Sequence, residues 1–267
     1  MRKKMYELAL FAGAGGGILG SMLSGHTCIG AVEYAEYPRK VLLARQRDGF
    51  LPKFPIWDDV STFRIDNEEC REYIELLKSK ADELCISGGF PCQDISSAGK
   101  GAGITADTRS GLWFEMARII DEIRPRNVFV ENSPMLTSRG LGIVLGDLAE
   151  MGYNAKWGVL GGEQTYGCCK RERLWIYACT NKERHARRRR QEHNIQEQQI
   201  YKNIKNNRDK IWSKAQQCLQ ISDWKNLFRS NGFRDGSEVA DRMDRLAAVG
   251  NGQDPRLVRT ILEMFKD

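Results

Sequence analysis

Short apolar runs alternate with longer amphipathic stretches along the first two thirds of the chain. Runs typical of buried strands occur at residues 8–11, 28–33, 84–86, 127–130, 154–160 and 174–179. Apolar residues recur with a helical period between them, at residues 18–24, 37–48, 68–81, 109–123 and 141–151. This alternation predicts an α/β fold in which helices cover both faces of a sheet. Ligands of such sheets bind at the carboxyl ends of the strands.

The alternation stops in residues 180–235, which are rich in Arg, Lys, Gln and Asn. They contain 14 Lys and Arg against 6 Asp and Glu, whereas the whole chain has a net charge of +6. A near-neutral body therefore carries one basic segment, which favours a polyanionic partner. Helical patterns return at residues 239–246 and 255–265.

Length and composition exclude several classes of protein. A chain of 267 residues with 41% hydrophobic residues can bury a core, and it contains no apolar run of about 18 residues that would predict a membrane-spanning helix. Glycines interrupt the N-terminal apolar run after Phe11, so we interpret it as a strand and not as a signal peptide. The eight cysteines lack the spacing of a zinc site, so we expect reduced thiols, a cytoplasmic location and no metal.

A glycine-rich turn separates the first predicted strand from the first predicted helix. Residues 11–17 read FAGAGGG, and residues 15–20 satisfy the GxGxxG pattern of dinucleotide-binding proteins. Such glycines let a ligand approach the main chain. Glu33 ends the second strand, where a carboxylate could hold ribose hydroxyls. These features alone fit NAD, S-adenosylmethionine or a plain tight turn.

Chemically reactive side chains follow three other predicted elements. Cys92 follows the strand at residues 84–86, where a thiol on a loop fits a nucleophile, although most lone cysteines are buried apolar residues. Glu131 follows the strand at residues 127–130 and fits either a general acid or a solvated carboxylate. Arg171 and Arg173 lie two residues apart in an extended segment, so their side chains point to the same side.

The order of these motifs resembles that of the cytosine-C5 DNA methyltransferase family. The matching motifs are FAGAGG at residues 11–16, PCQ at 91–93, ENS at 131–133, RxR at 171–173 and GNG at 250–252. The resemblance implies a Rossmann-like, S-adenosylmethionine-dependent methyltransferase fold with a mixed, mostly parallel sheet. It also implies three parts, which are a catalytic domain (1–179), a short basic target-recognition region (180–237) and a segment that returns to the catalytic domain (238–267).

The resemblance gives four side chains a chemical role. Cys92 would attack C6 of a cytosine flipped out of duplex DNA, because the C5–C6 edge is inaccessible in the stack. Glu131 would protonate or hydrogen-bond N3. Arg173 would hold O2 and orient Glu131, and Arg171 would contact a backbone phosphate. Addition at C6 makes C5 enamine-like, so that C5 can accept the methyl group.

The resemblance also implies two sets of binding residues. Glu33 would hold the cofactor ribose with Tyr34 beside the adenine, while Asp59 would meet the adenine amino group and Val60 would pack on the ring. The expected cofactor contacts are Phe11, Gly13, Gly15, Glu33, Tyr34, Asp59, Val60, Gly88, Pro91, Asn251 and Gly252. The expected DNA contacts are Gln93, Ser96, Arg187, Arg188, Arg189 and Arg190. The glycine-containing loop at residues 94–108 fits either a lid that closes over the flipped base or a passive surface loop.

Three positions depart from the family pattern. Cys168 and Cys169 stand where Pro-Gln is common, which puts in doubt the positioning role of that glutamine. Ser133 stands where valine is commoner, and Asp254 occupies a position that is more often apolar.

Three other functions compete with DNA methylation. An RNA cytosine-C5 methyltransferase would share the chemistry, but its typical Cys-Phe-Thr tripeptide is absent from this sequence. A non-catalytic DNA-binding relative would have lost Cys92, Glu131 or Arg173, and an NAD enzyme would explain none of the later motifs. We therefore expect a monomer that acts on double-stranded DNA, with a cognate restriction endonuclease as a further candidate partner.

The shortness of the basic region predicts a short recognition site or relaxed specificity. Its arginine run at residues 187–190 would contact phosphates, and such contacts are independent of base sequence. Bisulfite sequencing of DNA from cells that express the protein measures the site. A long, strictly defined site would contradict the prediction.

Overall fold

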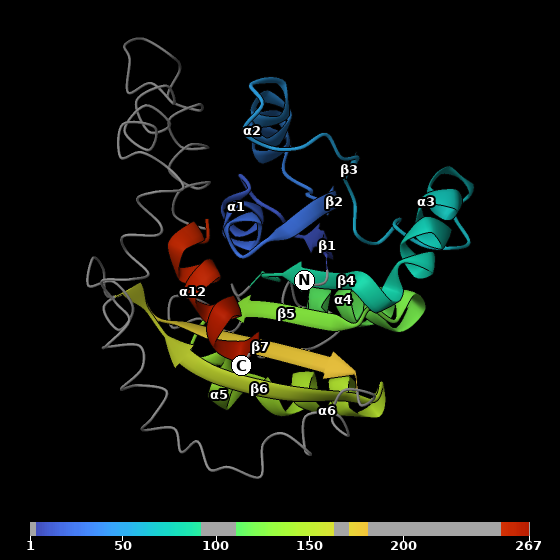
Figure 1. Ribbon diagram of the computed structural model, residues 1–267. Helices are drawn as coiled ribbons and strands as arrows, with labels where there is room; N and C mark the ends of the chain where they lie inside the picture. The colour runs from blue at the N-terminus through green and yellow to red at the C-terminus, as the bar shows by residue number, and fades with distance from the viewer. Residues whose placement is uncertain (1–3, 92–110, 163–170, 181–251, 267) are drawn as a thin grey trace.

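One mixed sheet forms the centre of the computed structural model, which describes residues 4–91, 111–162, 171–180 and 252–266 (Figure 1). In these residues the strand order is β3-β2-β1-β4-β5-β7-β6. The strands are β1 (Met5–Leu10), β2 (His26–Val32), β3 (Ile56–Trp57), β4 (Leu84–Gly88), β5 (Asn127–Asn132), β6 (Tyr153–Leu160) and β7 (Arg173–Thr180). The pairs from β3 to β5 are parallel, whereas β7 is antiparallel to both of its neighbours. The expected mixed, mostly parallel sheet is therefore confirmed.

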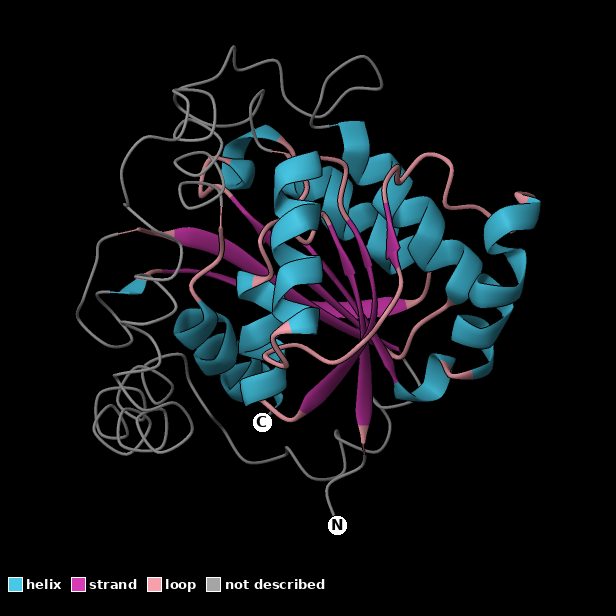
Figure 2. Cartoon of the chain, turned by 90° about the horizontal axis from the view of Figure 1, so that it is seen from above, coloured by secondary structure: helices cyan, strands magenta, loops and turns pink. Residues whose placement is uncertain are grey.

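Helices lie on both faces of this sheet (Figure 2). They are α1 (Gly16–Leu23), α2 (Glu36–Arg47), α3 (Glu68–Ser79), α4 (Leu112–Ile123), α5 (Leu136–Arg139), α6 (Leu141–Glu150) and α12 (Pro255–Lys266), with a 3₁₀ turn η1 (Ala81–Glu83). Their local sequences explain their limits. In α3, for example, the Asn67 side chain accepts a hydrogen bond from the Glu69 amide at the first turn, and Lys78 lies in the last turn. Asn67 satisfies a main-chain amide that has no partner within the helix, and the positive charge of Lys78 interacts favourably with the negative end of the helix dipole.

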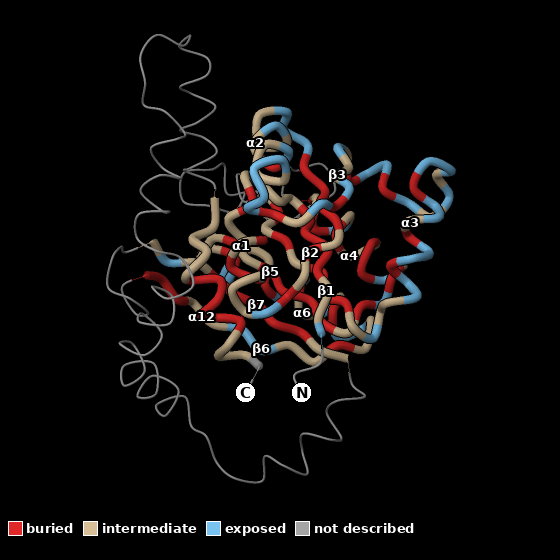
Figure 3. Tube along the Cα trace, turned by 45° about the horizontal axis from the view of Figure 1, so that its top comes forward, coloured by how far each residue is buried: buried red, intermediate tan, exposed pale blue. Residues whose placement is uncertain are grey.

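The alternation of side chains along each strand divides the core between the two faces. Leu8 and Ile86 face α3, α4 and α6, whereas Ala9 and Phe129 belong to the clusters on the side of α1, α2 and α12. The central strands are buried on both sides, and the outer turns of α2 and α3 are exposed (Figure 3). This explains why the central strands read as continuous apolar runs.

Because β7 is antiparallel, its first residues lie at the edge of the sheet where the parallel strands end. The carboxyl ends of the parallel strands meet at one edge, and β7 begins at that same edge because Leu174 pairs with Asn132. The first residue of β7, Arg173, therefore lies beside the last residues of β5. Strand direction thus brings together two segments that are more than 40 positions apart in the sequence.

The elements predicted from the sequence are present with small shifts. The differences within the described residues are the two-residue β3, the four-residue α5 and the extension of β5 through Asn132, so that Glu131 lies in the strand and not after it. β3 and α5 are too short to produce a periodic signal. The helix expected at residues 239–246 and the region expected at 180–237 lie outside the described residues, apart from Thr180. None of the helices in the described ranges is long and apolar enough to cross a membrane.

One carboxyl group is buried in the sheet beneath α1. Glu7 of β1 is fully buried, and one of its oxygens accepts hydrogen bonds from Ser21 and Ser87, both at 2.6 Å. The other oxygen has no hydrogen-bond partner among the described residues. Burial raises the pKa of Glu7 to about 7, and the two serine hydroxyls partly oppose that rise.

The raised pKa of Glu7 predicts a pH-dependent stability. The folded chain keeps a proton that the unfolded chain releases above about pH 4.5, so Glu7 costs stability as the pH rises from there to about 7. Glu7→Gln removes this titration. Relative to the native sequence, its free energy of unfolding should increase by about 2 kcal/mol between pH 5 and pH 8, as measured by urea denaturation.

Glu75→Gln provides the matched control, because the Glu75 side chain is 58% exposed. Its stability relative to the native sequence should stay the same at both pH values. A Glu7→Gln variant that behaves like this control would show that Glu7 does not titrate on folding.

Candidate active site

The glycine loop between β1 and α1 is bent sharply. Phe11, Gly13 and Gly15 have positive φ angles of 53°, 54° and 88°. For phenylalanine this is a strained backbone, of the kind that occurs at ligand sites. The loop is fixed at both ends, because the Ala12 amide donates to the Val32 carbonyl at 3.1 Å and the Gly15 amide donates to the Ala12 carbonyl.

Glu33 is oriented by the same loop. One carboxylate oxygen accepts a hydrogen bond from the Gly13 amide at 2.7 Å, and the other accepts one from the Ala35 amide at 2.8 Å. Each oxygen keeps lone pairs for further donors such as hydroxyl groups. The sequence-predicted pair of glycine loop and acid is therefore brought into direct contact.

Tyr34 and Asp59 lie near this acid at the same edge of the sheet. The Arg39 guanidinium donates to the carbonyls of Glu33 and Tyr34, and the Tyr34 residue is 78% exposed. The Glu33 amide donates to the Trp57 carbonyl, which brings the loop after β3 alongside. In that loop one Asp59 oxygen accepts from both the amide and the hydroxyl of Ser61.

Arg118 of α4 anchors the loop that carries Asp59 and Val60. Its guanidinium donates to the carbonyls of Val60 and Phe63 at 3.0 and 3.1 Å, and it pairs with two glutamates of its own helix. The Val60 side chain is 6% exposed and belongs to the core cluster. Arg118 was not predicted as part of the site, because an arginine inside a helix usually indicates a solvated surface.

Glu131 and Arg173 form an ion pair at the junction of β5 and β7. Glu131 pairs with Trp175 across the strands, so Arg173 is its diagonal neighbour on the same face. The Arg173 Nε lies 2.8 Å from the Glu131 Oε1, and the two side chains are 27% and 13% exposed. Burial raises the pKa of Glu131, while Arg173, Gln253 and Arg171 act in the opposite direction. The result is a carboxyl group that can hold a proton more readily than a surface glutamate.

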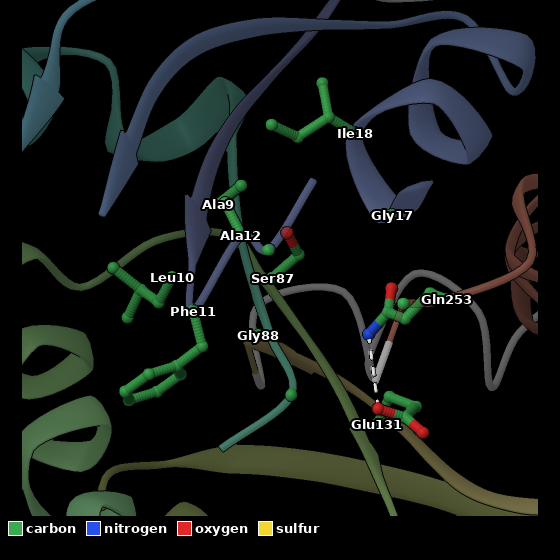
Figure 4. Close-up of a pocket in the computed structure, with 13 residues that line it drawn as sticks. Ala9, Leu10, Phe11, Ala12, Gly17, Ile18, Ser87, Gly88, Glu131 and Gln253 are labelled. Atoms are coloured by element: carbon green, nitrogen blue, oxygen red, sulfur yellow. Dashed lines mark hydrogen bonds between the residues drawn. The ribbon is translucent and has the colours of Figure 1, made fainter. Parts of the chain in front are cut away.

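Gln253 occupies the space between Glu131 and the glycine loop (Figure 4). Its side-chain amide nitrogen lies 3.4 Å from the Glu131 Oε2. A Cβ atom on Gly16 would lie 2.1 Å from the Gln253 carbonyl oxygen, and one on Gly17 would lie 2.4 Å from its side-chain oxygen. Only glycine fits at position 16, because the close atom there belongs to the main chain, whereas the close atom at position 17 is the end of the flexible Gln253 side chain.

The chain that leads from β4 toward Cys92 is held against β5. The buried Asn132 side chain donates to the Phe90 carbonyl at 3.1 Å and accepts from the Ser133 amide at 2.7 Å. A Cβ atom on Gly89 would lie 2.7 Å from the Glu131 Oε2, so this turn passes directly beside the acid. Pro91 is the last described residue of the segment.

Five of the predicted site residues line one pocket: Phe11, Gly13, Gly88, Glu131 and Gly252. Glu33 contacts its rim through Gly13. Tyr34, Asp59, Val60, Gly15 and Pro91 are outside the pocket lining. The structure adds eight residues to this lining, of which only Gln253 and Ser87 have polar side chains: Ala9, Leu10, Ala12, Gly17, Ile18, Ser87, Gly89 and Gln253.

Several predicted residues lie outside the described residues. They are Cys92, Gln93, Ser96, Arg187, Arg188, Arg189, Arg190 and Asn251, together with the loop at residues 94–108 and the pair Cys168 and Cys169. No cluster of three or more potential metal-binding side chains occurs in the part of the chain that the structure describes.

Comparison with known proteins gives a consistent result. A family model described as C-5 cytosine-specific DNA methylase matches residues 5–242. The type II methyltransferase M.Sau96I of Staphylococcus aureus is 32% identical over 170 residues, which are 62% of this chain and 36% of that protein. The type II methyltransferase M.HhaI of Haemophilus parahaemolyticus is 28% identical over 260 residues, which are 94% of this chain and 70% of that protein.

A solved structure supports the fold. The S. pombe Dnmt2 methyltransferase matches with a TM-score of 0.52 and 15% sequence identity, over 74% of this chain and 53% of that chain. The expected methyltransferase fold is thus confirmed, although this chain spans only about a third of the length of M.Sau96I. Because the family model covers most of the sequence, the chain belongs to the C-5 cytosine-specific DNA methylase family.

Proposed function

We propose that this protein transfers a methyl group from S-adenosylmethionine to C5 of cytosine in double-stranded DNA. The observation that carries the proposal is the partly buried Glu131–Arg173 pair, which lies beside a glycine loop at the carboxyl edge of the sheet. An acid of raised pKa that is oriented by a guanidinium can protonate a ring nitrogen while the arginine binds the adjacent carbonyl.

The residues present fit the cofactor. The Glu33 carboxylate is fixed by two main-chain amides and keeps lone pairs for two ribose hydroxyls. The Asp59 carboxylate would accept from the adenine amino group. The exposed Tyr34 ring offers a flat surface for the adenine beside Glu33. When bound, S-adenosylmethionine supplies an electrophilic methyl group on a sulfonium. Family membership favours this cofactor over NAD, which the glycine pattern alone leaves open.

Glu131 and Arg173 would activate the cytosine ring. Arg173 would donate to O2 and Glu131 would donate its proton to N3, which draws electron density away from C6. Arg171 carries the second positive charge that acts on Glu131, and it would contact a phosphate of the same strand. Burial of the acid serves this role, because it raises the pKa of Glu131 and so favours the protonated form.

Cys92 is the nucleophile in this proposal. Its thiolate adds to C6, and the C5–C6 electron pair becomes available at C5 as N3 takes the proton. S-adenosylmethionine, held by Glu33 and the glycine loop, would supply the methyl group that C5 accepts. A base removes the C5 proton, the double bond reforms, and the Cys92 thiolate leaves.

The DNA-facing part of the proposal depends on residues 180–237. The excess of positive charge in this region favours binding to the phosphate backbone of DNA. Base flipping would bring the cytosine to Glu131 at the carboxyl edge of the sheet. We propose that the protein acts as a cytoplasmic monomer in a bacterial or phage-infected cell. The partner would be a restriction endonuclease of the same specificity, and methylation would protect DNA from cleavage by it.

Cys92→Ser should abolish methyl transfer while DNA binding is retained, because the hydroxyl group is a far weaker nucleophile than the thiolate. The measurement is transfer of labelled methyl groups from S-adenosylmethionine to duplex DNA by the full chain, with binding measured on the same DNA. Duplex DNA that contains 5-fluorocytosine should form a covalent adduct only with the native sequence, because fluorine cannot leave as a cation.

Two results would contradict the proposal. Turnover by Cys92→Ser would refute the nucleophile, and transfer to tRNA but not to duplex DNA would identify an RNA methyltransferase. Glu131→Gln is the matched variant for the acid. It keeps the size of the side chain and removes the acidic proton that would be transferred to N3.

Asn132→Ala should slow methyl transfer more than it weakens DNA binding. The variant loses the hydrogen bond that holds the Phe90 carbonyl two residues before Cys92, and it leaves a buried acceptor without its donor. The free energy of unfolding should fall by about 1–3 kcal/mol. Thermal unfolding and single-turnover rates measure the two effects.

Ser138→Ala is the control for Asn132→Ala, because the Ser138 hydroxyl makes one exposed hydrogen bond within its own turn. It should change neither stability nor rate. An Asn132→Ala variant with the native single-turnover rate would show that this hydrogen bond does not position the nucleophile.

A further inference from the structure

Gln253 contacts the glycine loop and Glu131 at the same time. Its main-chain oxygen packs against Gly16 at a distance that excludes any larger residue there, and its side-chain oxygen packs against Gly17. Its side-chain nitrogen faces the Glu131 Oε2 at 3.4 Å. Figure 4 shows the two side chains pointing toward each other across the pocket.

The two oxygens of Glu131 have different neighbours. Oε1 is paired with the charged Arg173, whereas Oε2 faces the neutral amide of Gln253. The groups that act on Glu131 in the described residues are Arg173, Gln253 and Arg171, and all three stabilise its charged form. Arg173 fixes one oxygen only, so rotation of the carboxylate about its last bond is limited by Gln253.

We propose that Gln253 is a positioning residue of the methyl-transfer reaction, which holds the second oxygen of Glu131 in place and links its orientation to the packing of the glycine loop. The inference rests on the function proposed above and adds a residue to it. Sequence position alone gives no sign of this role, since a glutamine in the turn before a helix is usually a solvated residue.

The link to the glycine loop follows from the turn that carries Gln253. The Asp254 side chain accepts from the Arg256 amide at the start of α12, and α12 packs on α1. A shift of the glycine loop therefore moves the main chain of Gln253, and with it the amide beside Glu131. The acid would be oriented only when the loop that is proposed to bind the methyl donor is in place.

Gln253→Met tests the proposal, because methionine has a similar length and cannot donate a hydrogen bond. Loss of the donor should raise the pKa of Glu131 by about half a unit to one unit, since the charged form loses a partner. Carbon-13 NMR of the glutamate carboxyl groups measures this pKa, and the resonance is assigned by its loss in Glu131→Gln. The measurement needs neither DNA nor S-adenosylmethionine.

Kinetics provide the second readout. Gln253→Met should lower the single-turnover rate of methyl transfer by about threefold to tenfold, as expected for loss of one ordinary hydrogen bond. The KM for S-adenosylmethionine should change by less than about twofold, because the main-chain contact with Gly16 remains. The alkaline limb of the pH–rate profile should move to higher pH, together with the pKa of Glu131.

Asp254→Asn is the control in the same turn, because asparagine still accepts from the Arg256 amide and loses only the ion pair with the Arg256 guanidinium. It should leave the pKa of Glu131 unchanged or slightly lower. Gln253→Glu is the second variant in case methionine disturbs folding, and its added negative charge should raise the pKa of Glu131 further than methionine does.

An unchanged pKa of Glu131 in Gln253→Met would overturn the inference, as would a loss of activity that appears only in the KM for the methyl donor. If the native protein transfers no methyl group, the proposed function fails. The NMR comparison still decides whether Gln253 positions Glu131.

Discussion

A carboxylate that is removed from water needs a cation or hydrogen-bond donors, and the edge of this sheet supplies both to Glu131. The cation is Arg173, which reaches the acid only because β7 runs against β5 and begins where β5 ends. A parallel strand in that place would present its carboxyl end at this edge instead of its first residue. The antiparallel pair is therefore the constraint on which the acid chemistry depends.

The remaining loops of the site are held by a second set of contacts. Arg39 holds the carbonyls after β2, Arg118 holds the loop after β3, and Asn132 holds the chain after β4. Each contact joins a loop at the carboxyl edge to a neighbouring element, so the loops are fixed relative to the sheet. Preorganisation of this kind lets charged groups act without reorganising during the reaction.

The sequence predicted the strands, the helices and much of the site because apolar periodicity and motif order are local signals. It missed β3 and α5, which are too short to show a period, and it ended β5 before Glu131 because acids are uncommon inside strands. Gln253 and Arg118 were missed for a different reason. Their roles depend on contacts with residues far away in the sequence, and neither has a distinctive local pattern.

The packing of α12 on α1 also has a consequence for the order of events during synthesis. Gln253 follows Gly16 by 237 positions, so the ribosome needs roughly ten to fifty seconds to make the chain between them. Until then the glycine loop lacks the residues that pack on it, and the apolar side chains of β4, β5 and β7 that pack against α12 remain uncovered. A nascent chain at that stage would be a natural client for a chaperone.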